Sequence, residues 1–457
     1  MNGAITGVHL IGGWLPVVVD VAAVTLLIAV VGWSLVPAQR PGARLRWTLI
    51  ATISAAGGAA VGLLLCWLLS DWLNLFDVSL TSTSRAWVAG ALAAIAVAVA
   101  GVARSGLKGT RVRRVAATGA VVVALLAGAL GVNADFGQYT TLGSLGDAAA
   151  AAPLPASVLT EQLAGAPGAE QPSTRAPRPL WRIAMAVGMP RHGLVGSVTI
   201  PGTVSHFAAR DAYVYLPPAA LVRHPAALPV LIMMSGQPGS PSNVISSGQI
   251  AAIFDAFAKT HNGLAPIVLV PDQLGAPARN PMCVNGVLGA SERYLTVDVP
   301  DWIRSHLTVQ ASPAAWAIGG FSQGGTCSIQ LGAGHPELFS AIVDISGQLA
   351  PKNGDLAQTM AIGFGSSVAA YRAALPEAVL ARNTPYRPGI VAVFGVGQLD
   401  SRYGPIAARL AAAAQNAGIS ATEAISPGTG HDWHTVHWVL EHAMTPIYRQ
   451  LGLEGPS

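Results

Sequence analysis

A serine between two glycines is the part of this sequence best suited to chemistry. Ser322 lies in a Gly-x-Ser-x-Gly pattern over residues 320–324, after an apolar segment typical of a strand and before a pattern typical of a helix. In a nucleophile elbow the serine occupies a strained strand-to-helix turn, where nearby side chains would collide. The N-terminus of the following helix also favours an oxyanion. The pattern therefore predicts that Ser322 is a catalytic nucleophile, with a glycine-rich turn holding a chance serine as the alternative.

A serine nucleophile needs a base and an acid that orients the base, and in this type of site they follow the serine in the order acid, then histidine. Asp400 comes after the apolar segment 390–394 through a glycine-rich loop, where the end of a strand would bring it to the site. We predict Asp400 as the acid, with Asp344 and Asp355 as alternatives. His431, in a glycine-rich run after the last predicted strand, is predicted as the base.

Two further histidines follow His431 at three-residue steps, so a metal site is an alternative for this stretch. Successive steps of that size drift around a helix, and neither an HExxH motif nor a cysteine cluster accompanies His434 and His437. We expect both to be ordinary polar helix residues. The sequence predicts no metal and no organic cofactor.

The oxyanion that forms during attack requires two backbone N–H donors. One comes from the residue after the nucleophile, here Gln323. The other comes from the loop after the third strand, here residues 235–239, in which Pro238 has no N–H to give. We therefore predict Gln323 and Gln237 as the two donors. A plain turn is the alternative for the second loop.

These residues need a scaffold that brings distant segments together. Over residues 179–457, short apolar segments alternate with helical patterns, which predicts a mostly parallel sheet flanked by helices, with an antiparallel hairpin at its start. The predicted strands are 196–200, 212–216, 230–234, 267–270, 316–318, 341–345, 390–394 and 422–425, and the predicted helices include 249–260, 297–307, 326–332 and 405–417.

The first part of the chain differs from the rest in its long apolar stretches. With 52% hydrophobic and only 11% charged residues, the 457-residue chain is too apolar for an ordinary soluble enzyme. Four nearly uncharged stretches, each close to the length that crosses a bilayer, lie at 14–36, 47–69, 87–103 and 115–132. We predict an all-α four-helix transmembrane domain over residues 1–135 and an extracytoplasmic linker rich in alanine and proline over residues 136–178. A buried helical bundle is the alternative.

The basic residues predict the orientation of these spans. Three arginines lie within residues 40–46 and five basic residues within 104–114, whereas the stretch 70–86 has two aspartates and one arginine. By the positive-inside rule the two basic loops are cytoplasmic, and everything after residue 132 lies outside. The net charge of +4 then reflects topology and implies no nucleic-acid partner. Asp20, in the first span, is expected to be hydrated or hydrogen-bonded within the bundle, with a functional role as the alternative.

The three cysteines fall in different environments. Cys66 lies within the second span and is expected to pack there. Cys283 and Cys327 belong to the domain predicted to lie outside the cytoplasm, where oxidation is allowed. We hypothesise a disulfide between them, with two free buried thiols as the alternative.

Several motifs together resemble a known family. In chain order they are Val214-Tyr215-Leu216-Pro217-Pro218, Gly236-Gln237-Pro238-Gly239, Val270-Pro271-Asp272, Gly320-Phe321-Ser322-Gln323-Gly324-Gly325, His335-Pro336-Glu337-Leu338-Phe339 with Ile345-Ser346-Gly347, and Gly430-His431-Asp432-Trp433. Over roughly residues 195–450 they resemble the esterase D type esterases, which include the secreted actinobacterial mycolyltransferases. The resemblance implies an α/β-hydrolase fold with Ser322, Asp400 and His431 as the triad. The four-helix region followed by Asn133-Ala134-Asp135-Phe136-Gly137 is also similar to membrane-anchored members of that group from actinobacteria with mycolic-acid envelopes.

Two features depart from the mycolyltransferases, which lack a four-helix anchor and usually carry Met where this chain has Gln323. We therefore predict a serine esterase or acyltransferase, anchored in the cytoplasmic membrane with its catalytic domain outside, that acts on acyl esters of envelope lipids or glycolipids. Mycolyltransferase-like transfer to a sugar hydroxyl, a peptidase, and a non-catalytic membrane scaffold that retains the fold are alternatives. The oligomeric state stays open.

Overall fold

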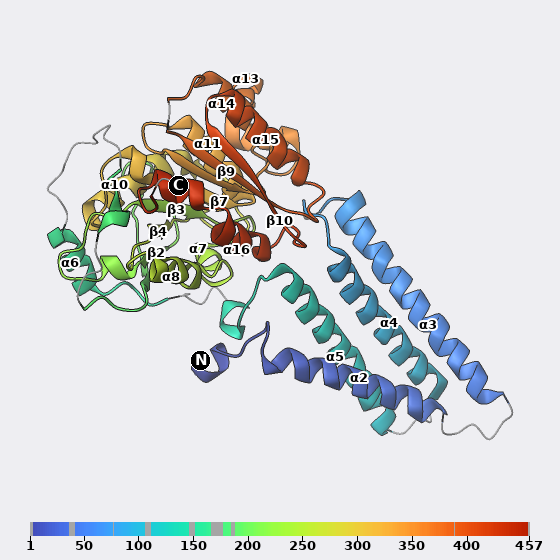
Figure 1. The fold of residues 1–457 in the computed structure, drawn as a ribbon. Coiled ribbons are helices and arrows are strands. Elements are labelled where there is room, and N and C mark those ends of the chain that lie inside the picture. The colour runs from blue at the N-terminus through green and yellow to red at the C-terminus, as the bar shows by residue number, and fades with distance from the viewer. Residues whose placement is uncertain are drawn as a thin grey trace. The chain divides into compact units, whose positions relative to one another are not determined.

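The chain is described by a computed structural model that covers residues 3–35, 42–75, 77–105, 111–145, 151–165, 177–183, 188–387 and 389–455. It divides into two compact units, Met1–Gly146 and Asp147–Ser457. The first is built from long helices, and the second from a sheet flanked by helices (Figure 1).

Four long apolar helices form the first unit. They are α2 (Trp14–Leu35), α3 (Ala43–Cys66, continued by the π-helical turn η1, Trp67–Trp72), α4 (Ser82–Ser105) and α5 (Arg111–Phe136), with the short α1 (Gly3–Thr6) before them and the 3-10 turn η2 (Leu142–Leu145) after them. Within the described ranges, these four are the helices long and apolar enough to cross a membrane. The four predicted apolar helices are therefore confirmed.

Small residues let these helices approach closely. A Cβ at Gly58 of α3 would lie 2.4 Å from Leu92 O of α4, and a Cβ at Gly131 of α5 would lie 2.0 Å from the Trp87 ring. Large apolar side chains point outward on each of the four helices, among them Val21, Ile53, Val99 and Val115. Small residues between helices and large apolar residues outside are typical of helices that pack in lipid.

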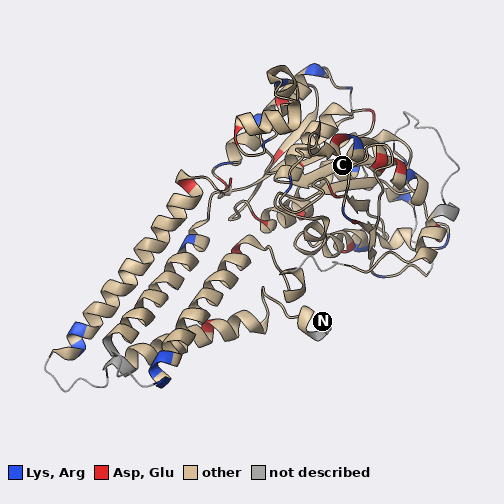
Figure 2. Cartoon of the chain, turned by 180° about the vertical axis from the view of Figure 1, so that it is seen from behind, with Lys and Arg blue, Asp and Glu red and all other residues tan. Residues whose placement is uncertain are grey.

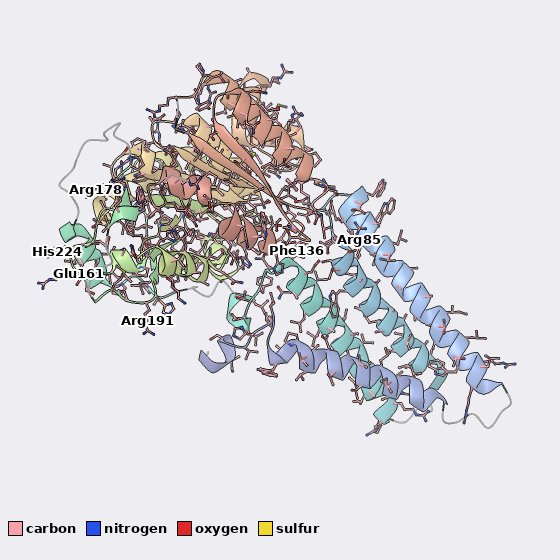
Figure 3. All side chains as sticks on the ribbon, in the orientation of Figure 1. Arg85, Phe136, Glu161, Arg178, Arg191 and His224 are labelled. Carbon is pink, nitrogen blue, oxygen red and sulfur yellow. A yellow bond between two sulfur atoms is a disulfide. The ribbon has the colours of Figure 1, made fainter. Side chains whose placement is uncertain are left out.

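Charged residues gather near the ends of these helices (Figure 2). Arginines occur in the first turns of α3 and α5, next to the loops predicted to be cytoplasmic. At the opposite ends, Arg85, labelled in Figure 3, forms two 2.9 Å hydrogen bonds with Asp71. Asp135 of α5 accepts hydrogen bonds from Thr81 and Ser84 at the start of α4.

Three further predictions about this unit concern the orientation of its helices, Asp20 and Cys66. Arg40 and Lys108, which belong to the two basic loops, lie outside the described residues, and the orientation stays a prediction. Asp20 lies on α2 and is partly exposed. Cys66 is buried with a free thiol, as expected.

An eight-stranded sheet forms the centre of the second unit. In spatial order its strands are β1 (Leu194–Val198), β2 (Ala212–Leu216), β4 (Ile267–Val270), β3 (Val230–Met234), β7 (Trp316–Phe321), β8 (Ala341–Ile345), β9 (Val391–Gly397) and β10 (Ser420–Ser426). β2 runs antiparallel to both of its neighbours, and every other pair in the sheet is parallel. The short strands β5 (Asn285–Gly286) and β6 (Gly289–Ala290) form a separate hairpin.

This sheet has the topology of an α/β-hydrolase. If β5 and β6 are left out, the strand order reads 1-2-4-3-5-6-7-8, with the second strand antiparallel. The predicted fold, a mostly parallel sheet with an antiparallel hairpin at its start, is confirmed. Because strands at the centre of the sheet are covered on both faces, every residue of the parallel strands β3, β4 and β8 and of the antiparallel β2 is buried.

Helices cover both faces of the sheet (Figure 1). One group includes α8 (Ile250–Thr260) and α16 (Trp433–His442), which contact each other, and the other includes α11 (Gln323–Gly334), α14 (Pro376–Arg382) and α15 (Gly404–Asn416). The remaining helical segments are η3 (Leu180–Arg182), η4 (Pro218–Ala220), α7 (Pro241–Ser246), α9 (Ser291–Arg293), η5 (Tyr294–Asp298), α10 (Val299–His306), η6 (Pro313–Ala315), α12 (Leu356–Phe364), α13 (Val368–Ala373) and α17 (Thr445–Gln450).

The predicted linker, residues 136–178, holds a helix that packs on the second unit. This helix, α6 (Ala156–Gly165), carries Glu161, labelled in Figure 3. The buried side chain of Gln162 donates to Ala220 O at 2.6 Å and accepts from Thr308 N at 3.1 Å. These long-range contacts hold part of the predicted linker in place.

The rest of this segment is described only in part. Just before α6, Ser197 N of β1 donates to Ala152 O, and Leu154 N donates to Ser197 O, both at 2.9 Å. Residues 146–150 and 166–176 lie outside the described residues. The predicted limits of the domains and the linker stay predictions.

Candidate active site

Ser322 occupies the turn between β7 and α11. Its backbone has φ 58° and ψ −115°, a strained conformation for a residue with a side chain. The Ser322 N–H donates to Ile345 O of β8 at 2.8 Å, and Thr326 N donates to Ser322 O at 3.0 Å. The turn is therefore held by the neighbouring strand and by the helix that follows. This is the backbone geometry of a nucleophile elbow.

The flanking glycines permit this turn. A Cβ at Gly320 would lie 2.4 Å from the carbonyl of Gly324, and a Cβ at Gly324 would lie 2.4 Å from Met234 O at the end of β3. Both distances are far shorter than a Cβ contact can be. A Cβ at Gly236 would lie 3.3 Å from the Ser322 Cβ, so the loop after β3 passes directly beside this serine.

Asp400 and His431 are in direct contact. Nδ1 of His431 lies 2.9 Å from Oδ2 of Asp400, and Tyr403 N donates to Oδ1 of the same carboxylate at 3.1 Å. The exposed fractions are only 6% for His431 and 2% for Asp400. A carboxylate that accepts from Nδ1–H leaves Nε2 as the basic nitrogen of the ring.

Two aromatic rings hold the imidazole of His431. Its centroid lies 4.9 Å from that of Phe321 and 4.4 Å from that of Tyr403. Phe321 directly precedes Ser322, so the first contact brings His431 to the elbow. Among the residues that the structure describes, no hydrogen bond joins the Ser322 hydroxyl to His431. The structure thus joins Asp400 to His431 directly and His431 to Ser322 through the neighbouring ring.

The two alternative acids have other surroundings. Asp344 on β8 is 2% exposed, and in the described part of the chain neither carboxylate oxygen has a hydrogen-bond partner. Burial raises the pKa of Asp344 to about 7. Asp355 caps α12 by accepting a hydrogen bond from Gln358 N at 2.7 Å. Of the three carboxylates considered from the sequence, Asp400 is the one in contact with His431.

The two additional histidines lie on α16. Nε2 of His437 lies 2.6 Å from Ser247 O, and burial lowers the pKa of this histidine below its usual value. The rings of His434 and His437 are 6.0 Å apart. Over the described ranges, no group of three or more His, Cys, Asp or Glu residues is placed to hold a metal ion.

The two predicted oxyanion donors lie on adjacent segments. Gln323 is the first residue of α11, and the first N–H groups of a helix have no acceptor within it. Gln237 lies on the loop after β3, next to Gly236, which approaches Ser322. In the described part of the chain, neither the Gln237 N–H nor the Gln323 N–H forms a hydrogen bond with a backbone carbonyl of a turn or loop.

A buried network of amide side chains, which was not predicted from the sequence, lies beside these donors. Gln273 Nε2 donates to Ser235 O at 2.6 Å and to Gln323 Oε1 at 3.0 Å. Gln323 Nε2 in turn lies 3.2 Å from Asn280 Oδ1 and 3.1 Å from Cys327 Sγ. The one signal for Gln273 was its position just beyond the carboxyl end of a predicted strand, where site residues gather in this type of sheet.

Cys283 and Cys327 form the predicted disulfide. It joins the segment between β4 and β5 to α11, the helix that begins directly after Ser322. Both sulfurs lie within 3.7 Å of the side-chain nitrogen of Gln323. The bridge is therefore next to the elbow.

Comparisons with known proteins agree with this architecture. The family model described as "Putative esterase" matches residues 208–438. An uncharacterized protein of Corynebacterium glutamicum is 32% identical over 337 residues, which make up 73% of this chain and 75% of that protein. The chain belongs to this esterase family. Its second unit is thus a hydrolase of the general esterase or acyltransferase class, with an α/β-hydrolase fold.

Two solved structures with a similar fold are an S-formylglutathione hydrolase and MPT51. An S-formylglutathione hydrolase from Agrobacterium tumefaciens is 18% identical, with a TM-score of 0.48, and the match covers 59% of this chain and 100% of that one. MPT51 of Mycobacterium tuberculosis is 17% identical, with a TM-score of 0.40, over 55% of this chain and 96% of that one.

Proposed function

We propose that Ser322, His431 and Asp400 form a catalytic triad, with which this esterase cleaves or transfers acyl esters through an acyl-enzyme. The observation that carries the proposal is the 2.9 Å contact between the buried side chains of His431 and Asp400, next to the strained turn of Ser322. A serine, an imidazole and an orienting carboxylate in this environment and chain order serve nucleophilic catalysis in α/β-hydrolases.

In this mechanism the Ser322 Oγ attacks the ester carbonyl carbon while His431 Nε2 takes the hydroxyl proton. The N–H groups of Gln323 and Gln237 bind the oxyanion, and His431 then gives the proton to the leaving alkoxide. Water or an acceptor hydroxyl attacks the acyl-enzyme, with His431 again as base, which releases the acid or a new ester and restores Ser322. Asp400 keeps the proton on Nδ1 throughout. The mechanism requires no metal or organic cofactor.

The test is labelling of the purified protein by a fluorophosphonate probe, whose phosphorus is attacked by an activated serine. The wild type should be labelled, whereas Ser322→Ala and His431→Ala should not. Asp400→Asn should slow labelling by a factor on the order of 10³–10⁴, because the imidazole loses its correct tautomer. Ser346→Ala is the matched control, since Ser346 also has a positive φ and follows the adjacent strand. A folded wild type without label would favour the non-catalytic membrane scaffold.

We also propose that the hydrolase unit works outside the cytoplasmic membrane. The arginines at the starts of α3 and α5 and a disulfide in the second unit support this location. Protease added to intact spheroplasts should then degrade the hydrolase unit and leave the helices. Protection of the hydrolase unit until the membrane is opened would contradict the orientation.

The substrates that we propose are acyl esters of envelope lipids or glycolipids. The support is the chain's own apolar helices, which would keep the hydrolase unit where such lipids lie. On esters carried in vesicles, the intact protein should be more active than a variant that lacks residues 1–146, the first compact unit. Equal activity of the two proteins would contradict this role.

Transfer to a sugar hydroxyl is the second candidate reaction. It is favoured by the series of motifs shared with mycolyltransferases, although Gln323 replaces the methionine usual there. Adding trehalose or glucose to an acyl-ester assay would separate the two reactions. An acylated sugar in the mass spectrum supports transfer, and release of free acid alone supports hydrolysis.

A further inference from the structure

We infer that Gln273 is a positioning residue, which holds the two halves of the oxyanion hole at a fixed separation. The inference rests on the function proposed above, because it concerns the N–H donors assigned there. One donor, Gln237, lies on the loop after β3, and the other, Gln323, begins α11. These two segments follow the adjacent strands β3 and β7, whose pairing ends at Met234 and Gly320. Beyond that point, side-chain contacts can fix the separation of the two donors.

The amide of Gln273 bridges the two segments. Its Nε2 donates to Ser235 O at 2.6 Å, on the loop that carries Gln237, and to the side chain of Gln323 at 3.0 Å. A backbone carbonyl can only accept, so the group that faces Ser235 must be the amide nitrogen. One of the two hydrogens of this nitrogen is then available for each side. Few side chains other than a primary amide can make this double donation.

Packing alone does not explain an amide at this place. Gln273 is completely buried, and its Oε1 has no hydrogen-bond partner among the described residues. A buried polar atom without a partner destabilises the folded state, and an apolar side chain of the same size would avoid that cost. The backbone of Gln273 is held as well, because the Ser291 hydroxyl donates to its carbonyl at 2.9 Å. The bridge is therefore rigid at its centre.

The far side of the bridge is also fixed. Gln323 Nε2 lies 3.2 Å from Asn280 Oδ1 and 3.1 Å from Cys327 Sγ, while its Oε1 accepts from Gln273. Asn280 Oδ1 also accepts from Met282 N at 2.8 Å, which orients that amide. The Gln323 backbone therefore cannot shift without breaking contacts on both sides of its side chain, and Gln273 ties it to the Ser235 loop.

Loss of the Gln273 bridge should weaken the stabilisation of the negatively charged transition state. An oxyanion gains from two donors only when both lie about 2.7–3.1 Å from the oxygen, and losing one donor costs on the order of 10²–10³ in kcat. Gln273→Met keeps the size of the side chain and removes both bridging hydrogen bonds. Since both donors remain but lose their fixed separation, we expect a smaller loss, roughly tenfold to a hundredfold in kcat for p-nitrophenyl butyrate, with KM little changed.

Gln273→Glu gives a second, pH-dependent test. An ionised Glu would face two acceptor oxygens with no hydrogen to donate, whereas a protonated Glu could still donate one. Activity relative to the wild type should therefore be lowest at pH 8 and should recover in part toward pH 5. A side chain that only fills space would show no such dependence.

The experiment uses the full chain in detergent, well below the unfolding temperature of each variant. It measures the rate constant of fluorophosphonate labelling together with kcat and KM for p-nitrophenyl butyrate. Gln310→Met is the matched control, because Gln310 is a buried glutamine that accepts from Arg178 N at 2.8 Å and precedes β7, at the end opposite to Ser322. The control should react at the wild-type rate, whereas Gln273→Met should be slower by the factor above.

The possible results distinguish a failure of the proposed function from a failure of the positioning role of Gln273. If the wild type is not labelled, the proposed function itself fails. If the wild type is labelled and Gln273→Met reacts equally fast, the triad stands and the positioning role is overturned. If Gln310→Met slows the reaction as much as Gln273→Met does, the effect is general destabilisation, which also overturns the positioning role.

Discussion

Replacing Asp344 with Asn should stabilise the hydrolase unit at neutral and alkaline pH. Asp344 is 2% exposed on β8, and neither carboxylate oxygen has a hydrogen-bond partner among the described residues. Its surroundings are tight, since a Cβ at Gly347 would lie 2.2 Å and a Cβ at Gly325 2.5 Å from Oδ1. Burial disfavours the charged carboxylate and raises its pKa to about 7.

The size of this stabilisation follows from the linkage between proton binding and folding. The folded protein keeps this proton up to about pH 7, whereas the unfolded chain releases it near the ordinary value of 3.8. Between these pH values the folded state binds one proton more than the unfolded state, so the free energy of unfolding falls by about 1.4 kcal/mol per pH unit as pH rises. Over about three pH units this amounts to about 4 kcal/mol, and above pH 7 the loss is constant. An Asn at position 344 is neutral at every pH and avoids the loss.

Urea unfolding of the full chain in detergent, followed by tryptophan fluorescence, would measure this effect. The free energy gained by Asp344→Asn should be about 3 kcal/mol larger at pH 8 than at pH 5. Asp301→Asn, on an exposed part of α10, serves as a control for the loss of one negative charge. A gain of the same size at both pH values would refute the reasoning.

Three further predictions concern this unit, two on its stability and one on its reactivity. Replacing both cysteines of the disulfide with Ser opens a loop of 44 residues and should lower the free energy of unfolding by about 4 kcal/mol; equal urea midpoints would count against this. The pKa of His335 is raised, mainly by its hydrogen bond to Glu292, so the stabilisation is present below about pH 6.5 and is lost as pH rises through the raised value. Glu292→Gln should therefore lower Tm at pH 6 and leave it nearly unchanged at pH 9. An equal drop in Tm at both pH values would contradict stabilisation by the His335–Glu292 pair. Gly324→Ala would place a Cβ 2.4 Å from a backbone oxygen and should abolish labelling by fluorophosphonate, whereas Gly404→Ala, with nothing within 4 Å of the Cβ, should be labelled normally.

The centre of the sheet could be predicted from the sequence because strands buried on both faces are short, continuous apolar runs. Four strands agree with the prediction at both ends: 212–216, 230–234, 267–270 and 341–345. The prediction ended β7 at residue 318, whereas β7 pairs with β8 through Gly319 and Gly320 as far as Phe321. Glycine carries no strand signal of its own, so only the partner strand reveals these residues. The same holds for the end of β9 at Gly397.

The candidate site also has a part that could be predicted from the sequence and a part that could not. The elbow has a signature in residue types at fixed spacing, and the order of the acid and the histidine along the chain limited the choice of partners. The preference for Asp400 over Asp344 agrees with the contact to His431, but the sequence could not show how deeply Asp344 is buried. The network of Gln273, Asn280, Gln323 and Ser235 joins three segments: the connection between β4 and β5, the start of α11 and the loop after β3. No local pattern marks side chains that meet only in the folded chain.

The pairing of residues 152–154 with β1 has a practical consequence. β1 is an edge strand of the sheet, and Ala152 and Leu154 satisfy the N–H and C=O of Ser197 on its open side. A soluble catalytic fragment cut at the predicted domain limit, residue 179, would lack this cover together with α6 and the hydrogen bonds of Gln162. Unpaired edge groups are a template for strand addition by another molecule, so such a fragment should aggregate. A fragment that begins before Ala152 keeps the edge closed.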